Sequence, residues 1–423
     1  MKKRLVIIGA GPAGLAVAIS AVKFGISPDD MLIIERESEL GGVLNQCIHN
    51  GFGEHSIGKA LTGTEYAERF IDEALRLGIP YLTDSTVLSV SKEKEITFVS
   101  TKMGYSKIKA DAIVFAIGCR ERSQGSLHIA GTRPAGVFSA GTVQRFINIE
   151  GYLPGKNAIL FGSGDIGLVT ARRLALEGAN VIGAYEMKSY PTGSYKNVKE
   201  CLTDFDIPFY TNKTITKILG KERIEGVVVC DTDDDLRAIS GTEQLLKCDT
   251  LVLSLGLIPD NIITKEAGIT IDKETGGAEV NQYYETDLDG VFVSGNVLHI
   301  HDLVDYITLE SELVGKGVTA YLLGKIPPPQ KQIRVSHNDQ IKYTVPQKFS
   351  FPAYEDCDNV IFYYRALRVM KKAKITLRAD EKELVSEVKS NITPSQLHQI
   401  KISKEILKEF SIANKITLEA TEV

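Results

Sequence analysis

The sequence predicts an α/β fold in which one strand–turn–helix unit occurs twice and a small β-rich region follows. Residues 5–14 read LVIIGAGPAG and residues 158–167 read AILFGSGDIG, so an apolar run leads directly into G-x-G-x-x-G in both places. A shorter repeat supports the duplication, because residues 111–118 (DAIVFAIG) and 248–256 (CDTLVLSLG) each contain an acid, an apolar run and a final glycine. Repeats of this kind are typical of parallel sheets covered by helices.

Composition bounds the class of protein. The chain has 423 residues, of which 43% are hydrophobic and 24% charged, so it is globular and long enough for two or three domains. Its formal net charge of −5 makes nucleic acid and anionic membranes poor candidate partners. The six cysteines include no C-x-x-C pair, which argues against a disulfide framework and a zinc ribbon.

The predicted elements follow in order along the chain. In the first unit a helix is expected over residues 13–24, and the next apolar strand ends at Glu35. In the second unit a helix is expected over 166–177, and the following strand ends at Glu186. A last helix is predicted over 302–323. Beyond a run of three prolines the pattern changes to short alternating strands.

These elements define three expected domains, two of them Rossmann-like and built to bind dinucleotides. The first is discontinuous, because the chain leaves it for the second unit and then returns. The predicted domains are residues 1–120 with 261–326, residues 121–260, and a small β-rich C-terminal domain over 327–423.

The first twenty residues resemble a secretory signal, with a basic start and an apolar run. Glycines and a proline interrupt that run and would break a membrane helix. We therefore expect a cytoplasmic protein without a transmembrane segment.

The G-x-G-x-x-G motif has a specific physical purpose. Its first glycine permits a tight turn, its second lets the backbone approach a pyrophosphate at the helix N-terminus, and its third permits close helix–strand packing. The acid ending the next strand accepts hydrogen bonds from the adenosine ribose. The predicted binding residues are Gly9, Gly11, Pro12, Ala13, Gly14 and Glu35 in the first motif, and Gly162, Gly164, Asp165, Ile166, Gly167 and Glu186 in the second.

Two dinucleotide sites in one chain suggest electron transfer between FAD and NAD. The first site is assigned to the flavin, because Arg36 and the pair Gly41–Gly42 follow Glu35 closely and let the chain pass near a diphosphate. Residues 290–297 are expected to add a second helix N-terminus directed at the flavin. In the second site the carboxylate of Glu186 favours NAD over NADP, since it repels a 2′-phosphate.

These residues resemble the FAD-dependent pyridine nucleotide–disulfide oxidoreductase superfamily over about residues 3–326. The motifs that carry the resemblance are GAGPAG, the segment from Glu35 to Gly42, AIG at 116–118, GSGDIG, LGLIPD at 255–260 and T-x-x-x-G-V-F-V-S-G-N at 286–296. The resemblance implies an FAD-dependent oxidoreductase with a glutathione/thioredoxin-reductase-like pair of domains.

Within that group the chain resembles the FAD/NAD-binding subunits of opine, proline and cyanide-forming dehydrogenases. It resembles still more the flavoprotein encoded beside a bacterial glycerol-3-phosphate dehydrogenase. Residues 41–53, 130–148 and 294–305 carry this narrower resemblance. It implies partner dehydrogenase or electron-carrier subunits, and a homo-oligomer is a further possibility.

The resemblance also implies roles for individual residues. Asn296 stands where the superfamily usually has Asp, so its contact with the ribityl chain should persist with altered strength. By the internal repeat, Gly256 corresponds to Gly118 and is expected at the second cofactor. The other implied flavin-site residues are Gly42, Val43 and Leu44 beside the flavin, Val87 at the adenine through its main chain, Ala116, Ile117 and Gly118 on the crossover strand, and Gly295.

Cys47 is the one candidate catalytic residue. Disulfide reductases of the superfamily carry two cysteines just after the glycine pair, whereas LNQCIHN offers one. A single thiol near the flavin could act if a helix N-terminus or a cation lowered its pKa, and a buried packing thiol is the alternative. The remaining cysteines are interpreted as structural: Cys119, Cys201, Cys230, Cys248 and Cys357.

The pattern His299-x-His301-Asp302 raises the possibility of a metal site. Alternation along a strand would place both imidazoles on one face, but the sequence shows no third ligand, so no metal is expected. The histidines could instead tune the flavin or cap the helix predicted to start near Asp302.

Three functions follow from these observations. The first is an NADH:acceptor oxidoreductase that works as one subunit of a larger dehydrogenase. The second is a disulfide or peroxide reductase that uses Cys47. The third is a non-catalytic subunit that carries FAD beside a vestigial NAD site.

Overall fold

The structure is a computed structural model that describes residues 2–127, 129–355 and 360–423. Backbone contacts divide the chain into two compact units. The first unit contains Met1–Asn45, Asn50–Cys119 and Pro259–Val423, and the second contains Gln46–His49 and Arg120–Ile258. Within the described ranges, no helix combines the length and the apolar composition needed to cross a bilayer.

The first unit is built on a mainly parallel sheet whose central strands are apolar runs buried on both faces. Its strands are β1 (Lys2–Ile8), β2 (Met31–Ile34), β5 (Tyr81–Leu82), β6 (Ser85–Val90), β7 (Glu95–Ser100), β8 (Gly104–Phe115) and β20 (Val291–Val293). The order is β5-β2-β1-β8-β7-β6. The last three residues of β8, residues 113–115, also pair with β20. The parallel register places Ile7 beside Ile33 and Val114, so the carboxyl ends of three strands meet at one edge.

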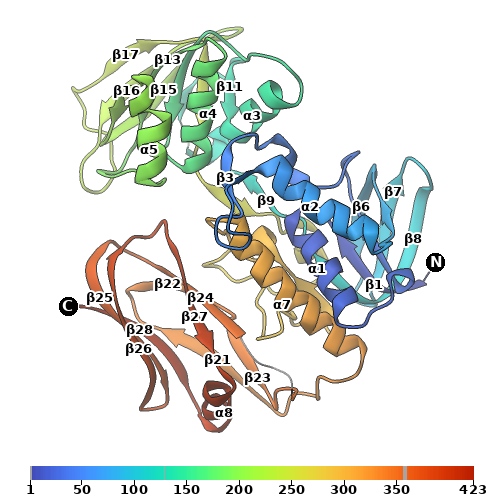
Figure 1. Cartoon of the computed structure of the whole chain (residues 1–423). Coiled ribbons are helices and arrows are strands. Elements are labelled where there is room, and N and C mark those ends of the chain that lie inside the picture. The colour runs from blue at the N-terminus through green and yellow to red at the C-terminus, as the bar shows by residue number, and fades with distance from the viewer. Residues whose placement is uncertain (1, 128, 356–359) are drawn as a thin grey trace. The chain divides into compact units, whose positions relative to one another are not determined.

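Two helices of this unit pack side by side, as Figure 1 shows. They are α1 (Pro12–Lys23) and α7 (Val304–Leu322). Small residues allow the close approach, because a Cβ on Gly315 would lie 2.5 Å from the Ser20 side chain. The Ser20 hydroxyl donates to the Glu312 carbonyl at 2.7 Å. The other elements of this unit include η1 (Pro28–Asp30), η2 (Gly42–Gln46), β3 (Asn50–Phe52), β4 (Leu61–Thr62), α2 (Gly63–Arg76), α6 (Ile262–Glu266) and η5 (Gly295–Val297).

The second unit combines a parallel sheet with a smaller sheet. The parallel strands are β11 (Val137–Ser139), β18 (Thr250–Leu253), β12 (Asn157–Phe161), β13 (Asn180–Tyr185) and β14 (Phe209–Tyr210), in that order. The smaller sheet has the order β10 (Ala130–Gly131), β15 (Lys213–Gly220), β16 (Ile224–Asp231) and β17 (Gln244–Lys247). The helices are α3 (Ala140–Asn148), α4 (Asp165–Leu176) and α5 (Tyr195–Cys201). The strands β9 (Cys119–Glu121) and β19 (Leu257–Pro259) pair with each other.

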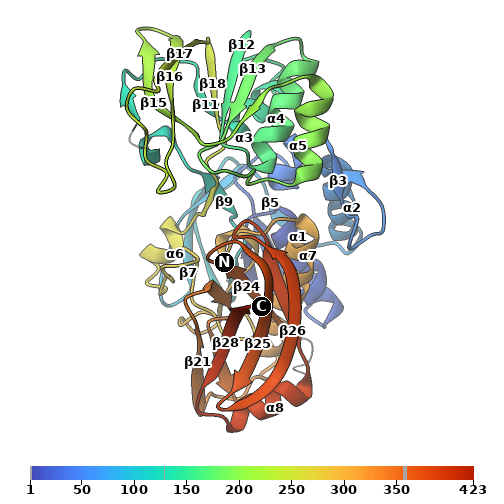
Figure 2. The same ribbon diagram turned by 90° about the vertical axis from the view of Figure 1, so that its left-hand side faces the viewer.

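The C-terminal part is β-rich, as predicted, and Figure 2 shows its longest strands as one curved sheet. Aromatic side chains fill its core, including Phe349, Phe362 and Phe410, which are fully buried. Its elements are β21 (Lys331–His337), β22 (Ile341–Val345), β23 (Lys348–Phe351), β24 (Val360–Ala366), β25 (Met370–Ala379), β26 (Lys382–Ile392), β27 (Leu397–Ile402), α8 (Lys404–Ile412) and β28 (Ile416–Glu422). Contacts group it with the first unit, and we keep its separation as a third domain as a proposal.

The predicted helices are present with shifted ends. Those expected over 13–24 and 166–177 are α1 and α4, each starting one residue earlier. The helix expected over 302–323 is α7, which starts at Val304. The reason for the later start is that Asp302 does not cap the helix, since its carboxylate pairs with Arg365 at 2.6 Å.

Arg365 ties the C-terminal strands to the loop before α7. The side chain is only 8% exposed. Besides Asp302, it donates to the Ile300 carbonyl at 2.9 Å and to the Tyr343 hydroxyl at 3.0 Å. The second Asp302 oxygen accepts the Leu397 N–H at 2.6 Å. A buried charge with this many partners holds the loop in one conformation.

We expect Arg365→Ala to lower the free energy of unfolding of the first unit by about 1–3 kcal/mol, because the Ile300 carbonyl and the Tyr343 hydroxyl lose this hydrogen-bond partner. Thermal unfolding measured by calorimetry tests this. Arg368→Ala is the control, since Arg368 is 57% exposed and lies 3.6 Å from Asp339, and it should cost less than about 0.5 kcal/mol. Equal melting temperatures for both variants would contradict the role given to Arg365.

Candidate dinucleotide sites

The first glycine motif brings β1, the turn and α1 into backbone contact. Gly9 has a φ of +101°, and a Cβ there would lie 2.5 Å from the Ala116 carbonyl oxygen. A Cβ on Gly14 would lie 1.9 Å from the Gly9 carbonyl oxygen. Both positions therefore require glycine for steric reasons, which confirms the physical basis of the motif.

The middle glycine of this motif faces open space instead. A Cβ on Gly11 would meet only the Gly42 Cα, at 4.0 Å. Helix α1 begins just after its N-cap residue, Gly11, which has no side chain to cap the helix. Pro12 takes the first position, and the first turn contains no acidic residue. The free N–H groups and the helix dipole make this end of α1 suitable for a diphosphate.

Glu35 is held in position for a ribose. The side chain is buried, with its Oε2 accepting the Ala10 N–H at 2.6 Å and its Oε1 accepting the Glu37 N–H at 2.9 Å. Each carboxylate oxygen keeps a lone pair for a further hydrogen bond. Arg36 is exposed and lies 3.4 Å from the Glu37 carboxylate. The first site therefore fits the adenosine half of FAD.

Two residues predicted beside the flavin differ in orientation. Val43 is 62% exposed, whereas Leu44 is buried in a small apolar cluster with Tyr66 and Val304. Leu44 could thus reach a cofactor only through its main chain. Of the other predicted residues, Val87 is buried on β6, Ala116 donates its N–H to the Ile8 carbonyl at 2.8 Å, Ile117 packs against the core, and Gly118 has a φ of +75°.

The last flavin motif is organised differently from the prediction. The sequence predicted a second helix N-terminus over 290–297, but the structure has the three-residue turn η5 there. The Gly295 N–H points inward and donates to the Glu310 carboxylate at 2.8 Å. The Asn296 side-chain oxygen accepts the His301 N–H at 3.0 Å. These two polar groups are therefore engaged within the protein.

The second glycine motif satisfies the same steric rules. Gly162 has a φ of +89°, and a Cβ there would lie 2.1 Å from the Ser254 carbonyl oxygen. A Cβ on Gly167 would lie 2.4 Å from the Ser254 side chain. Gly164 is the N-cap of α4, whose first two residues are Asp165 and Ile166. Gly256 follows β18 with a φ of +88°.

The acid of the second site is more fully engaged than Glu35. Glu186 is buried, and its Oε2 accepts both the N–H of Ser163, at 3.0 Å, and the hydroxyl of Ser163, at 2.5 Å. Its Oε1 accepts the Lys188 N–H at 3.1 Å. The Thr192 hydroxyl also donates to Oε2, at 3.4 Å.

A segment of the same unit, residues 190–194, covers the start of α4. The Thr192 N–H donates to the Ser163 hydroxyl at 2.9 Å, and the Gly193 N–H donates to the Ser163 carbonyl at 2.8 Å. The Ser194 N–H donates to the Asp165 carboxylate at 2.8 Å. A Cβ on Gly193 would lie only 2.9 Å from the Asp165 nitrogen. The second site therefore fits a dinucleotide only when this segment moves away from the helix start.

Cys47 does not have the surroundings of a reactive thiol. It belongs with the second unit and is partly exposed by area, yet the atoms packed round its sulfur desolvate it, and burial raises its pKa to about 12. Burial, with Arg172, lowers the pKa of His49 to about 4, so this neighbour is neutral at pH 7. Cys119 is half-buried, and Cys201, Cys230 and Cys248 are buried, whereas Cys357 lies outside the described residues.

The sequence missed one residue of the histidine cluster. His299 and His301 do not cap α7, and both Nε2 atoms approach the Glu310 carboxylate from the preceding loop. All three side chains are fully shielded from solvent. Burial lowers the pKa of His299 to about 4, so it is neutral at pH 7. An acid in the middle of α7 gave no signal, because an isolated glutamate in a helix is usually solvated.

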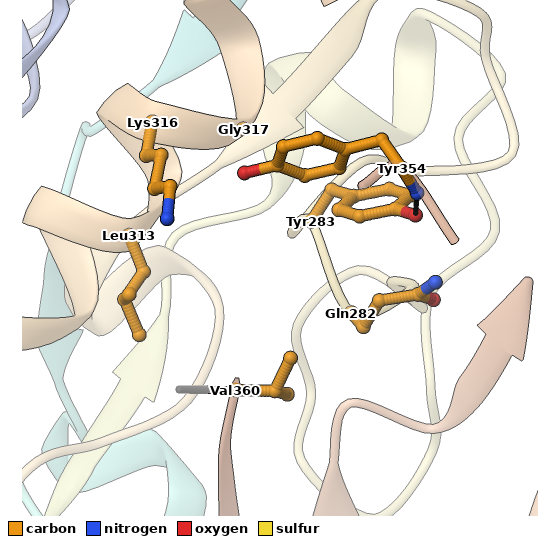
Figure 3. A pocket seen from close by; sticks show the side chains of 7 residues that line it. All are labelled: Gln282, Tyr283, Leu313, Lys316, Gly317, Tyr354 and Val360. Carbon is orange, nitrogen blue, oxygen red and sulfur yellow. Dashed lines mark hydrogen bonds between the residues drawn. The ribbon is translucent and has the colours of Figure 1, made fainter. Parts of the chain in front are cut away.

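A small pocket elsewhere in the first unit contains none of the predicted site residues. Its walls include Gln282, Lys316 and Tyr354, as Figure 3 shows. The Tyr354 N–H donates to the Tyr283 hydroxyl at 3.1 Å across one side. Its volume of about 20 Å³ suits one water molecule and excludes a cofactor.

We expect Gly11→Ala to weaken FAD binding without destabilising the fold. The φ of −72° suits alanine and the methyl group has space, but it would project into the region where the diphosphate approaches. The dissociation constant for FAD should rise at least about tenfold, measured by flavin fluorescence on the apoprotein. Gly164→Ala, the equivalent change in the second motif, is the control and should leave FAD affinity unchanged. Unaltered affinity in Gly11→Ala would contradict the site.

We expect Cys47 to react slowly with iodoacetamide. With a pKa of about 12 its thiolate is scarce at pH 8, so alkylation should be about a thousandfold slower than for N-acetylcysteine. Peptide mapping by mass spectrometry measures the rate. Below the thiol pKa the rate should rise about tenfold per pH unit. Rapid labelling at neutral pH would show that the thiol is activated after all.

The chain is similar in sequence to several known proteins. The chain is 25% identical to thioredoxin reductase of Bacillus subtilis, over 69% of this chain and 86% of that protein. It is 26% identical to an NADH oxidase of Methanocaldococcus jannaschii, over 76% of this chain and 68% of that protein. It is 24% identical to the glutamate synthase [NADPH] small chain of Halomonas elongata, over 76% of this chain and 68% of that protein.

Solved structures confirm the fold. Thioredoxin reductase of T. acidophilum matches with a TM-score of 0.61 and 20% identity, over 75% of this chain and 98% of that one. An NAD-dependent persulfide reductase of A. fulgidus matches with a TM-score of 0.56 and 16% identity, over 96% of this chain and 71% of that one. The family model for pyridine nucleotide-disulphide oxidoreductases matches residues 3–316. FAD and a nicotinamide dinucleotide, the cofactors predicted from the sequence, are those of this family. The chain belongs to the pyridine nucleotide-disulphide oxidoreductase family and is an FAD-dependent oxidoreductase.

Proposed function

We propose that the protein passes electrons between NADH and a partner subunit of a larger dehydrogenase. The observation that carries this proposal is the contrast between the FAD site and Cys47. The start of α1 and Glu35 are prepared for the cofactor, whereas the thiol is desolvated. The sequence has no second cysteine within the LNQCIHN segment. We therefore infer that electrons leave for an acceptor other than the Cys47 thiol.

The roles of the chain's own residues are binding and orientation. The free N–H groups at the start of α1 neutralise the diphosphate, and Glu35 accepts hydrogen bonds from the ribose. In the second site Glu186 disfavours a 2′-phosphate. When bound, FAD supplies the redox chemistry itself. No group with acid–base chemistry is needed from the protein in this scheme.

The partner is proposed on resemblance and on the relatives. The narrower resemblance implies a dehydrogenase complex, with a link to glycerol 3-phosphate as one proposal. One relative is named as the small chain of glutamate synthase. The solved structure of L-proline dehydrogenase from P. horikoshii has a similar fold, at 19% identity and a TM-score of 0.55, over 77% of this chain and 55% of that one. We propose partner dehydrogenase or electron-carrier subunits, a cytoplasmic location, and self-association as an open alternative.

A second candidate function is favoured by the segment over α4. Residues 190–194 occupy the helix start that a nicotinamide dinucleotide needs. If the segment stays in place, the flavin receives electrons only from the partner, and the chain acts as a flavin-carrying subunit. The thiol-based reductase has no comparable support, since the surroundings of Cys47 oppose thiolate formation.

An anaerobic titration of the flavoprotein with NADH and, separately, NADPH distinguishes these functions. We expect NADH to bleach the flavin stoichiometrically at a concentration at least about tenfold below that of NADPH, because Glu186 repels a 2′-phosphate. Flavin absorption is the readout, with dithionite as the reference for full reduction. Cys47→Ser should behave as the wild type.

The variant Ser163→Ala tests the segment. It removes the hydroxyl that holds Thr192 and Glu186, and it should lower the NADH concentration needed for bleaching. The wild-type protein, in which that hydroxyl is present, serves for comparison. If NADH bleaches neither the wild type nor Ser163→Ala, while dithionite reduces both, the NADH function is refuted and the flavin-carrying subunit remains.

A further inference from the structure

A buried cluster of two histidines and one glutamate joins the loop after η5 to helix α7. Nε2 of His299 lies 2.9 Å from Oε2 of Glu310, and Nε2 of His301 lies 3.1 Å from the same oxygen. The three side chains are fully shielded from solvent. We propose that these three atoms bind a divalent transition-metal ion, with Zn²⁺ as the best match to the donors.

Asn296 determines which nitrogen of His301 carries a proton. The Asn296 side-chain oxygen accepts the backbone N–H of His301 at 3.0 Å, which identifies this atom as an acceptor. The same oxygen lies 3.2 Å from Nδ1 of His301, so Nδ1 must be the donor. A neutral imidazole carries one N–H, so Nε2 then presents a lone pair. That lone pair faces a carboxylate oxygen, so the contact is favourable only when a cation lies between the two atoms, either a metal ion or a second proton on the ring.

The geometry suits a metal ion. A tetrahedral zinc with bonds of about 2.0–2.2 Å has ligand atoms about 3.3–3.6 Å apart. The observed separations of 2.9 and 3.1 Å are shorter, so the ligand atoms must move apart by several tenths of an ångström to admit the ion. Two histidines and one glutamate form a known zinc-binding set.

The atoms behind two of the three ligands, Glu310 and His301, are also arranged as around a metal. The second oxygen of Glu310 accepts the Gly295 N–H at 2.8 Å, which fixes the direction of the carboxylate. The Asn296 oxygen orients the His301 ring in the same way. Hydrogen bonds to the ligand atoms that do not bind the metal are typical of metal sites.

A second observation concerns Tyr363, whose ring centre lies 5.1 Å from that of His299 and 5.8 Å from that of His301. The Tyr363 hydroxyl and Nδ1 of His299 are both buried without a hydrogen-bond partner among the residues described. A water bound to the ion as its fourth ligand would supply a partner for the Tyr363 hydroxyl, but not for Nδ1 of His299, which points away from an ion bound at Nε2.

The role that follows is structural. The ion would tie Gly295 and Asn296, two residues of the last flavin motif, to the middle of α7. Zn²⁺ has no redox chemistry of its own, so it would hold the loop and take no part in electron transfer. This inference does not depend on the proposed acceptor or on NADH.

Metal analysis of the full-length protein tests the site. The protein is produced with added zinc sulfate, and zinc per chain is measured by inductively coupled plasma mass spectrometry. We expect about one zinc per chain in the wild type and less than about a tenth in Glu310→Gln. His337→Gln is the matched control, because His337 also faces a glutamate, Glu274 at 3.1 Å, but lies outside the cluster. It should keep its zinc.

Two results would overturn the proposal. A wild type without zinc would leave a proton on His301 as the cation that satisfies the cluster, and this result does not depend on whether a variant folds. X-ray absorption at the zinc edge gives the second result. Two imidazoles with only nitrogen and oxygen ligands are expected, and sulfur ligands would place the ion at cysteines elsewhere.

Discussion

The rest of the first unit depends on the contact between the backbone of β1 and that of α1. Where Gly9 and Gly14 stand, neighbouring carbonyl oxygens occupy the space of a side chain. This contact places the first turn of α1 directly at the carboxyl end of the sheet. Glu35, at the end of the next strand, is then brought to the same edge, where the Ala10 N–H holds it. A positive helix end and an oriented acid arise from one steric constraint.

The second unit obeys the same constraint but has a different outcome. Gly162 and Gly167 bring strand and helix together as in the first unit. Here, however, Ser163 stands between the glycines and its hydroxyl binds both Glu186 and the segment that follows. Equal glycine motifs therefore lead to one open site and one that is covered by its own chain. The difference comes from a side chain that the motif leaves unspecified.

Two buried charges, those of Arg365 and Glu310, connect the loop between η5 and α7 to its surroundings. Asp302 pairs with Arg365 of the C-terminal strands, and Glu310 of α7 reaches Gly295, His299 and His301. A charge removed from water is tolerated only where partners compensate for the lost hydration. The loop between η5 and α7 is therefore held at both ends. This explains why a stretch without regular structure can present a cofactor motif reproducibly.

The sequence by itself determined the α/β class, both glycine motifs and the acids Glu35 and Glu186, because these depend on periodicity and on short fixed spacings. It also determined the isolation of Cys47 from a second cysteine. Only the tertiary structure decided that Glu310 joins His299 and His301, since that contact depends on how α7 packs beneath the loop. It alone decided that residues 190–194 cover α4 and that the Cys47 thiol is desolvated. Such contacts join residues whose separations follow no local repeat, so no spacing in the sequence reports them.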